Sequence, residues 1–264
     1  MAYMIVMAGA AATINSLPHT YALWKVIKIV VVCYLIWRWR KLTVELNWRF
    51  DFLAIPVGVG VFVVWLLLRW LVAGELGDRV GPLLHGQPAD IPPPSPDQSF
   101  WVRHRNDASV FWPAYVTHLI AMCFAVPMIE EMFNRSVILR SMARPRRTAL
   151  GLIHVALDLP VVGDWLLNTR VGQQAAERPP VFAEEFNRNE LGTITVFGVF
   201  ASTLVFMLVH LPADWPGCVA CGVAYCLLLA ATRKKGLGPV IWAHCITNAL
   251  LWVYVLWSGD WQFL

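Results

Sequence analysis

Charged side chains are scarce in this sequence: Asp, Glu, Lys and Arg together make up 14% of its 264 residues, whereas 58% are hydrophobic. The mean hydropathy is accordingly positive, at +0.57. So few charges cannot cover the surface of a water-soluble domain, and the chain is therefore predicted to lie in a membrane, with lipids as its surroundings. The net charge of +4 comes mainly from a few short basic segments, and nucleic acid is not expected as a partner.

A basic N-terminal start is also missing, because residues 1–12 contain no Lys or Arg. This argues against a cleavable signal peptide, so the first apolar segment is predicted to be a retained membrane span. Apolar runs suited to cross a bilayer as helices occur about seven times. The predicted spans are 2–16, 21–38, 52–73, 111–142, 192–211, 217–232 and 238–257. The predicted fold is all-α, a polytopic transmembrane helix bundle that forms one domain over 1–264.

Cysteine is missing from the predicted outward-facing loops, which argues against a disulfide framework. The six cysteines all lie inside or at the edge of predicted spans: Cys33, Cys123, Cys218, Cys221, Cys226 and Cys245. Cys218 and Cys221 have the spacing of a redox or metal site. They also begin an apolar helix, however, where small residues three apart allow close helix packing, and packing is the favoured interpretation.

Basic residues gather after the second, fourth and sixth predicted spans. They are Arg38, Arg40, Lys41 and Arg49, then Arg144, Arg146 and Arg147, then Arg233, Lys234 and Lys235. With seven spans all three groups fall on the same side of the membrane. The positive-inside rule makes that side cytoplasmic, which puts the N-terminus inside and the C-terminus outside.

Two polar insertions separate the spans. Residues 74–110 include a proline-rich stretch at 90–97 that favours extended polyproline structure, and this outer loop is interpreted as a spacer. Residues 143–191 contain an apolar stretch, 149–167, which is broken by Pro160 and other polar or small residues. An interfacial or re-entrant helix fits this stretch better than a span.

Ionisable residues inside a membrane are costly, so those in the fourth span are functional candidates by default. At about 100° per residue Glu131 and Arg135 share one helix face and can pair, whereas Glu130 points elsewhere and stays free. Pro127 precedes Glu130 by three residues and removes a backbone donor, so an irregularity or bend is expected beside the free carboxylate.

Two later spans carry histidines. His210 lies one turn after Phe206 near the end of the fifth span, and His244 and Asn248 share one face of the seventh. A carboxylate beside an imidazole can take a proton from water, and a second histidine with an amide can bind the oxyanion formed at an attacked carbonyl. Each histidine taken alone can equally be a helix-packing hydrogen bonder, and His118 is interpreted in that way.

Three motifs in series strengthen this interpretation: Glu-Glu-x-x-x-Arg at 130–135, Phe-x-x-x-His at 206–210 and His-x-x-x-Asn at 244–248. Together they resemble the CPBP family of CaaX protease and bacteriocin-processing intramembrane proteins. Over 215–225, 243–248 and 254–261 the chain looks most like the bacterial, exosortase-associated subgroup of CAAX prenyl protease-related proteins. The resemblance implies a catalytic core at about 110–257 and a place in the bacterial inner membrane.

By this resemblance Glu130 and His210 activate water, and His244 and Asn248 hold the oxyanion. Glu131, Arg135 and Phe206 are supporting residues. Zinc is a possible cofactor, with Glu130, His210 and His244 as its ligands. A His-Glu-x-x-His helix is missing and Asn is a poor zinc ligand, so metal-independent catalysis is favoured.

The expected function is therefore an intramembrane endopeptidase acting on a membrane-associated or prenylated CaaX-type substrate. The alternative is a non-catalytic membrane scaffold or immunity-type partner that binds a ligand in the same pocket. A transporter is disfavoured because repeated halves and paired broken helices are missing. One conflict remains, since His210 is predicted at the outer end of its span whereas His244 lies near the inner end of its own.

Overall fold

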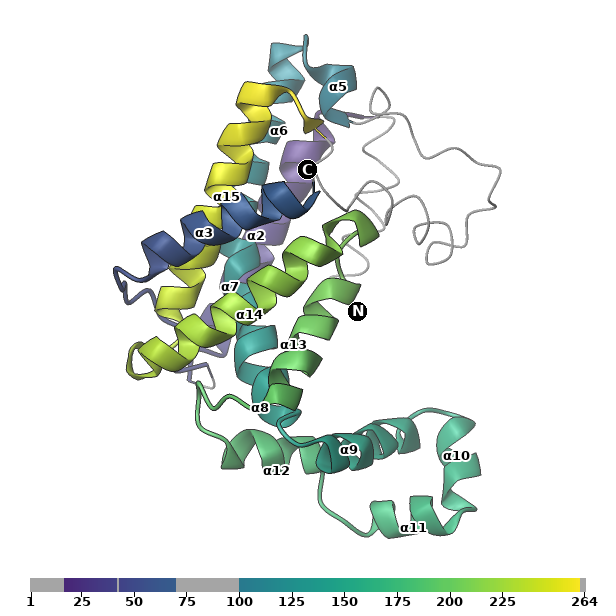
Figure 1. Ribbon diagram of the computed structural model, residues 1–264. Helices are drawn as coiled ribbons and strands as arrows, with labels where there is room; N and C mark the ends of the chain where they lie inside the picture. Colours follow the sequence, from purple (N-terminus) through teal and green to yellow (C-terminus); the bar gives the residue numbers. More distant parts are fainter. Residues whose placement is uncertain (1–16, 42, 70–99, 262–264) are drawn as a thin grey trace.

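The computed structural model describes residues 17–41, 43–69 and 100–261, and within these ranges the chain forms helices and turns without a β-strand (Figure 1). The helices that carry the bundle are α2 (Thr20–Arg38), α3 (Ala54–Leu68), α5 (Phe100–His104), α6 (Ala108–Ile120), α7 (Val126–Glu131), α8 (Leu139–Ser141), α13 (Val196–Leu208), α14 (Trp215–Thr232) and α15 (Gly238–Ser258). Four further helices stand beside the bundle: α9 (Pro145–Leu157), α10 (Val162–Leu167), α11 (Arg170–Ala176) and α12 (Val181–Arg188). The all-α prediction is confirmed.

Four of the described helices are long and apolar enough to cross a membrane: Thr20–Arg38, Ala108–Ser141, Pro212–Lys235 and Gly238–Ser258. Two others are apolar but shorter, α3 with 15 residues and α13 with 13. A helix of 15 residues rises about 22 Å, which is less than the roughly 30 Å hydrocarbon core. The count of about seven spans is therefore not confirmed, and the predicted span 2–16 lies outside the described residues.

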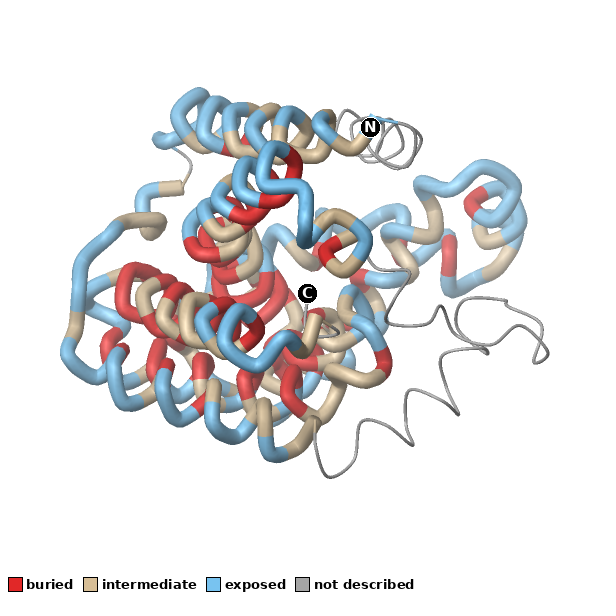
Figure 2. Tube along the Cα trace, turned by 90° about the horizontal axis from the view of Figure 1, so that it is seen from above, coloured by how far each residue is buried: buried red, intermediate tan, exposed pale blue. Residues whose placement is uncertain are grey.

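The outer surface of the bundle is apolar. Seen from above, buried positions line the contacts between helices and exposed positions follow the outside (Figure 2). Many of those outside positions carry large hydrophobic side chains, for example Val30 at 59% exposure, Leu227 at 59% and Val253 at 64%. A surface of this kind suits lipid and not water, which supports an integral membrane protein.

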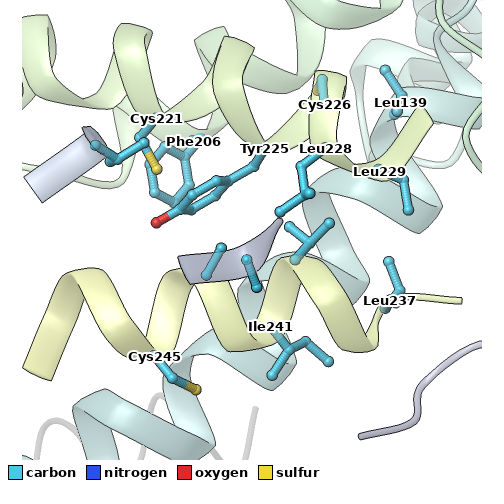
Figure 3. Packing of buried hydrophobic residues seen from close by; sticks show 14 of the residues in the cluster. Leu139, Phe206, Cys221, Tyr225, Cys226, Leu228, Leu229, Leu237, Ile241 and Cys245 are labelled. Atoms are coloured by element: carbon cyan, nitrogen blue, oxygen red, sulfur yellow. The ribbon is translucent and has the colours of Figure 1, made fainter. Parts of the chain in front are cut away.

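The core forms where α3, α14 and α15 pack on one another (Figure 1). Tyr225, Leu229 and Ile241 are fully buried there, and cysteines fill smaller gaps (Figure 3). All six cysteines are free thiols. A Cβ at Gly58 would lie 2.6 Å from the carbonyl oxygen of Ala243, so only glycine allows α3 and α15 to approach this closely.

The fourth predicted span is one long helical column, 108–141, in which two π-helical segments flank α7. They are η3 (Ala121–Ala125) and η4 (Met132–Ile138). The N–H of Val126 donates to the carbonyl of Ala121, five residues back, and Pro127 follows with no N–H to give. The predicted irregularity beside Glu130 is confirmed, and it takes the form of π-turns, which often occur at functional sites.

Helices α9 to α12 form a lobe, defined here as residues 144–189, beside one end of the bundle (Figure 1). Arg140 Nε donates to the carbonyl of Asn189 at 2.7 Å, and the Asn189 amide returns a bond of 2.9 Å to the Arg140 carbonyl. Arg144 Nε donates to Glu185 Oε2 at 2.8 Å. None of the four helices is among the candidate spans, as predicted for this insertion.

The three basic segments meet at one end of the bundle. Arg140 Nη1 lies 3.1 Å from a carboxylate oxygen of Glu45, which lies within the first basic group. The N–H of Leu237, just after the third group, donates to the Glu45 carbonyl at 3.0 Å. Lys235 pairs with Asp51 at 2.7 Å. The predicted gathering of these charges on one side is therefore confirmed, while the side of the membrane they occupy stays a prediction.

Candidate active site

A cavity of about 260 Å³ lies inside the bundle, and all four predicted site residues line it. Glu130 comes from α7, His210 from the turn after α13, and His244 and Asn248 from α15. Among the other lining residues are Trp65, His118, Met122, Phe206, Asp214, Tyr225 and Thr247. Side chains more than a hundred positions apart in the sequence thus converge on one chamber.

The conflict over the depth of His210 is resolved by the short connection after α13. That helix ends at Leu208, and the chain then turns through a 3-10 segment, Pro212–Asp214, into α14. His210 Nδ1 is 2.7 Å from the carbonyl oxygen of Phe206. A carbonyl only accepts, so Nδ1 carries the proton and Nε2 of the neutral ring keeps a lone pair.

Glu131 and Arg135 form the predicted pair, with 3.1 Å between Glu131 Oε2 and Arg135 Nε. Both side chains are fully buried. The guanidinium also faces two aromatic rings, at 5.0 Å from the centroid of Phe206 and 5.5 Å from that of Tyr225. Cation–π contact and the carboxylate together stabilise a charge that has left water.

Glu131 has a second contact, which the sequence did not predict: its Oε1 accepts from His244 Nδ1 at 2.7 Å. This carboxylate therefore bridges the buried guanidinium and the imidazole of α15. The bond fixes the ring of His244 and leaves Nε2 as the nitrogen available to the cavity. Glu131 was expected only as a supporting residue, and it contacts a predicted catalytic histidine directly.

Glu130 is free of Arg135, as predicted, and its side chain keeps 24% of its exposure. His244 lies nearby, with 3.7 Å between Glu130 Oε2 and His244 Nε2. That distance exceeds a hydrogen bond, so Glu130 remains able to bind a water molecule. Glu130 and His210 share the cavity wall, but no hydrogen bond joins them in the described ranges.

Asn248 of α15 is hydrogen-bonded to the π-helical segment η3. Its Nδ2 donates to the carbonyl of Met122 at 2.7 Å. In the π-helical register that carbonyl would receive the N–H of residue 127, which is a proline. Asn248 therefore satisfies an acceptor that Pro127 leaves open, and the amide retains one further N–H for a ligand.

Sequence reasoning missed His118, which was interpreted as a packing residue. It lies on the cavity wall and its Nδ1 is hydrogen-bonded to the Tyr21 hydroxyl. Its ring packs 4.8 Å from that of Trp252. A signal was present, because His118, Met122, Val126 and Glu130 recur every four residues and all four line the cavity.

Asp214 is a second cavity residue that was not singled out. It is paired with Arg69, whose side chain is only 11% exposed, so the pair closes one side of the chamber without adding a free charge. Trp65 stands beside it, with its ring 6.4 Å from that of His210.

The residues suggested as zinc ligands do not fit an ion as they lie. Zinc ligands must converge to about 2.0–2.3 Å from one point. Over 17–41, 43–69 and 100–261, no three His, Cys, Asp or Glu side chains come close enough together to hold a metal. Glu130, His210 and His244 share a chamber but not a coordination sphere.

A family model described as type II CAAX prenyl endopeptidase Rce1-like matches residues 112–250, which is more than half of the chain. The matched range contains all of the predicted site residues. No curated protein and no solved structure matches the sequence. The match does not separate subgroups, so the exosortase-associated assignment stays a prediction. The chain belongs to the Rce1-like type II CAAX prenyl endopeptidase family and is, by this membership, a membrane protease.

Proposed function

We propose that this protein is an intramembrane endopeptidase that hydrolyses a peptide bond in a membrane-associated, CaaX-type substrate. The observation that carries the proposal is the single cavity shared by Glu130, His210, His244 and Asn248. A carboxylate, two imidazoles and an amide in one partly buried chamber are the groups that peptide hydrolysis needs.

Glu130 is the proposed general base. Its carboxylate is partly exposed to the cavity and is not neutralised by Arg135, so it can accept a proton from water. His210, with Nδ1 bonded to the Phe206 carbonyl, offers its Nε2 lone pair to orient the same water. The hydroxide equivalent attacks the scissile carbonyl carbon, and the carbonyl oxygen becomes an oxyanion.

His244 and Asn248 are the proposed oxyanion donors. Because Nδ1 of His244 donates to Glu131, its Nε2 can donate only when the ring carries both protons. Glu131 Oε1 lies 2.7 Å from Nδ1 of this ring, and Glu130 Oε2 lies 3.7 Å from its Nε2. Glu131 is accordingly proposed as a positioning residue that holds the His244 ring with Nε2 toward the cavity.

Collapse of the tetrahedral intermediate completes the reaction. The carbon–nitrogen bond breaks, the proton taken by Glu130 passes to the leaving amine, and the products are a new carboxylate and a free amine. Every atom and proton is supplied by water and the peptide, so this route requires no metal. Zinc-dependent hydrolysis is the competing route within the same cavity.

The proposed setting is the inner membrane of a bacterium, with the N-terminus and the basic end of the bundle in the cytoplasm. The clustering of Arg140, Lys235 and their neighbours at one end supports this orientation. Substrates would then be cleaved near the inner leaflet.

Substrate trapping tests the proposal. Membranes expressing the wild-type protein, Glu130→Gln or the control Glu177→Gln are compared by mass spectrometry of new peptide C-termini and of proteins that copurify. Glu177 lies on the exposed end of α11, so its isosteric change should leave cleavage intact. New termini are expected with the wild type and Glu177→Gln, and uncut substrate is expected to accumulate on Glu130→Gln.

The same experiment separates a protease from a scaffold. If identical termini appear with all three proteins, Glu130 is not the base and the proposal fails. The alternative function, a non-catalytic membrane scaffold or partner, is supported if two results are found together. No cleavage product depends on the protein, and the variants His210→Asn and His244→Asn keep the cellular effect of the wild type.

A further inference from the structure

The lobe presents an apolar surface to its surroundings, and this surface centres on α9. Leu152 is 53% exposed, Val155 50% and Leu159 50%. Leu152 and Val155 lie three residues apart on one side of α9. Leu159 follows in the turn after the last helical residue, Leu157, and the three are called the stripe. Exposed positions next to the stripe are Pro145 and Ala149, which are also apolar.

Two polar side chains of α9, Thr148 and His154, face the rest of the lobe instead. Thr148 is buried at 5% exposure. His154 Nε2 bonds to the carbonyl of Ala175 at 2.7 Å, and His154 Nδ1 accepts from the N–H of Val181. The helix thus reverses the arrangement of a water-facing helix, in which polar residues lie outside and apolar residues inside.

The turn after α9 extends the same apolar surface. Val161 is 78% exposed and Trp165 65%. Val161 has a φ of +69°, a left-handed conformation that strains a β-branched residue. The backbone at Val161 is thus in an unfavourable conformation that leaves the valine side chain exposed. An exposed valine at such a position suits contact with an apolar medium and not with water.

We infer that this surface, Leu152, Val155, Leu159, Val161 and Trp165, docks the lobe onto the lipid bilayer at the headgroup and upper acyl boundary. Its position supports lipid over any protein partner. The spanning column ends at Ser141 and α9 begins four residues later at Pro145, so the lobe adjoins the end of the bundle where the basic segments meet. In the view of Figure 1, α9 runs crosswise to α15, as an interfacial helix must.

The ends of the surface suit an interface as well. Arg146 is exposed at the start of α9, where a guanidinium can reach lipid phosphates, and Trp165 is the residue type that prefers the headgroup level. The lobe docks as one body, because a side chain at Gly163 or Gly172 would collide with the backbone of the preceding helix. Small residues therefore lock α10 and α11 into place.

Depth-dependent quenching tests this inference on the full-length protein. Cys33, the one exposed cysteine, is replaced by Ser, and single cysteines are introduced as Leu152→Cys, Gln174→Cys and Leu227→Cys. Gln174 on α11 is the water-facing control and Leu227 on α14 the lipid-facing control. Each variant is labelled with a small fluorophore and placed as a single copy in phosphatidylcholine–phosphatidylglycerol nanodiscs. A second copy then cannot cover the lobe.

The label at Leu152 is expected to be quenched several-fold more by a lipid bearing a nitroxide near the top of its acyl chain than the label at Gln174. Iodide in the buffer is expected to show the opposite order. The inference is overturned if iodide quenches Leu152 as strongly as Gln174, or if neither quencher reaches Leu152, which would mean that protein covers the stripe. Unchanged thermal unfolding of each variant in detergent shows that the lobe remains folded.

Discussion

Glu131→Gln is the most informative change to the buried network beside the cavity. Glu131 and Arg135 are both fully buried, and Gln removes the carboxylate that pairs with the guanidinium. Breaking a buried ion pair from one side costs about 3–5 kcal/mol, because the remaining charge is left uncompensated. Cation–π contact with Phe206 and Tyr225 offsets part of that loss.

A second change separates stability from catalysis. Arg135→Met removes the stranded cation, so the double variant Glu131→Gln/Arg135→Met is expected to recover most of the free energy of unfolding. Its kcat should nevertheless stay low, because the neutral Gln amide replaces the carboxylate that accepts the His244 Nδ1–H bond and orients the ring. Losing one oxyanion donor costs about 10²–10³-fold in kcat, which sets the expected scale.

Both quantities can be measured on purified protein in micelles, by denaturant unfolding and by cleavage of a prenylated CaaX peptide. Recovery of both stability and kcat in the double variant would refute the positioning role, and would leave Glu131 only the task of neutralising Arg135.

Three further predictions concern other parts of the chain. Pro127→Ala should lower kcat without loss of stability, because the restored N–H competes with Asn248 for the Met122 carbonyl. An unchanged kcat would argue against the proposed role of Asn248 as an oxyanion donor. Hydrogen bonds from Arg144 hold the pKa of Glu185 below its usual value of 4.5. The ionised Glu185 therefore stabilises the lobe fully above that value, and this stabilisation is lost as pH falls through the lowered pKa. Hydrogen exchange in the lobe should rise on acidification, and the rise should be smaller in Glu185→Gln. Prolonged treatment with a zinc chelator is expected to leave peptide cleavage unchanged, whereas loss of activity together with release of one zinc ion per chain would establish the metal-dependent route.

Local geometry made some of these contacts predictable. The Glu131–Arg135 pair follows from two residues four apart on one helix, and the shared face of His244 and Asn248 follows in the same way. The irregularity beside Glu130 follows from Pro127. These features depend on one helix at a time, and the sequence contains what is needed to derive them.

Contacts between helices could not be derived in this way. The bond from His244 to Glu131 depends on the depth at which α7 and α15 meet, and no pattern within either helix specifies that depth. The count of spans was uncertain for a related reason. α13 runs from Val196 to Leu208, inside the predicted span 192–211, because its ends depend on the Thr195 cap and on the turn after Leu208, which hydropathy does not record. Residues 70–73 of the predicted span 52–73 lie outside the described residues.

The rate of cleavage by Glu130→Gln tests the proposed chemistry most directly. Wild-type protein, Glu130→Gln and Glu177→Gln are compared in identical nanodiscs under single-turnover conditions with a prenylated CaaX peptide. A general base contributes about 10²–10⁴-fold, so Glu130→Gln is expected to lose at least two orders of magnitude while Glu177→Gln matches the wild type. Cleavage by folded Glu130→Gln at the wild-type rate would contradict water activation by this carboxylate.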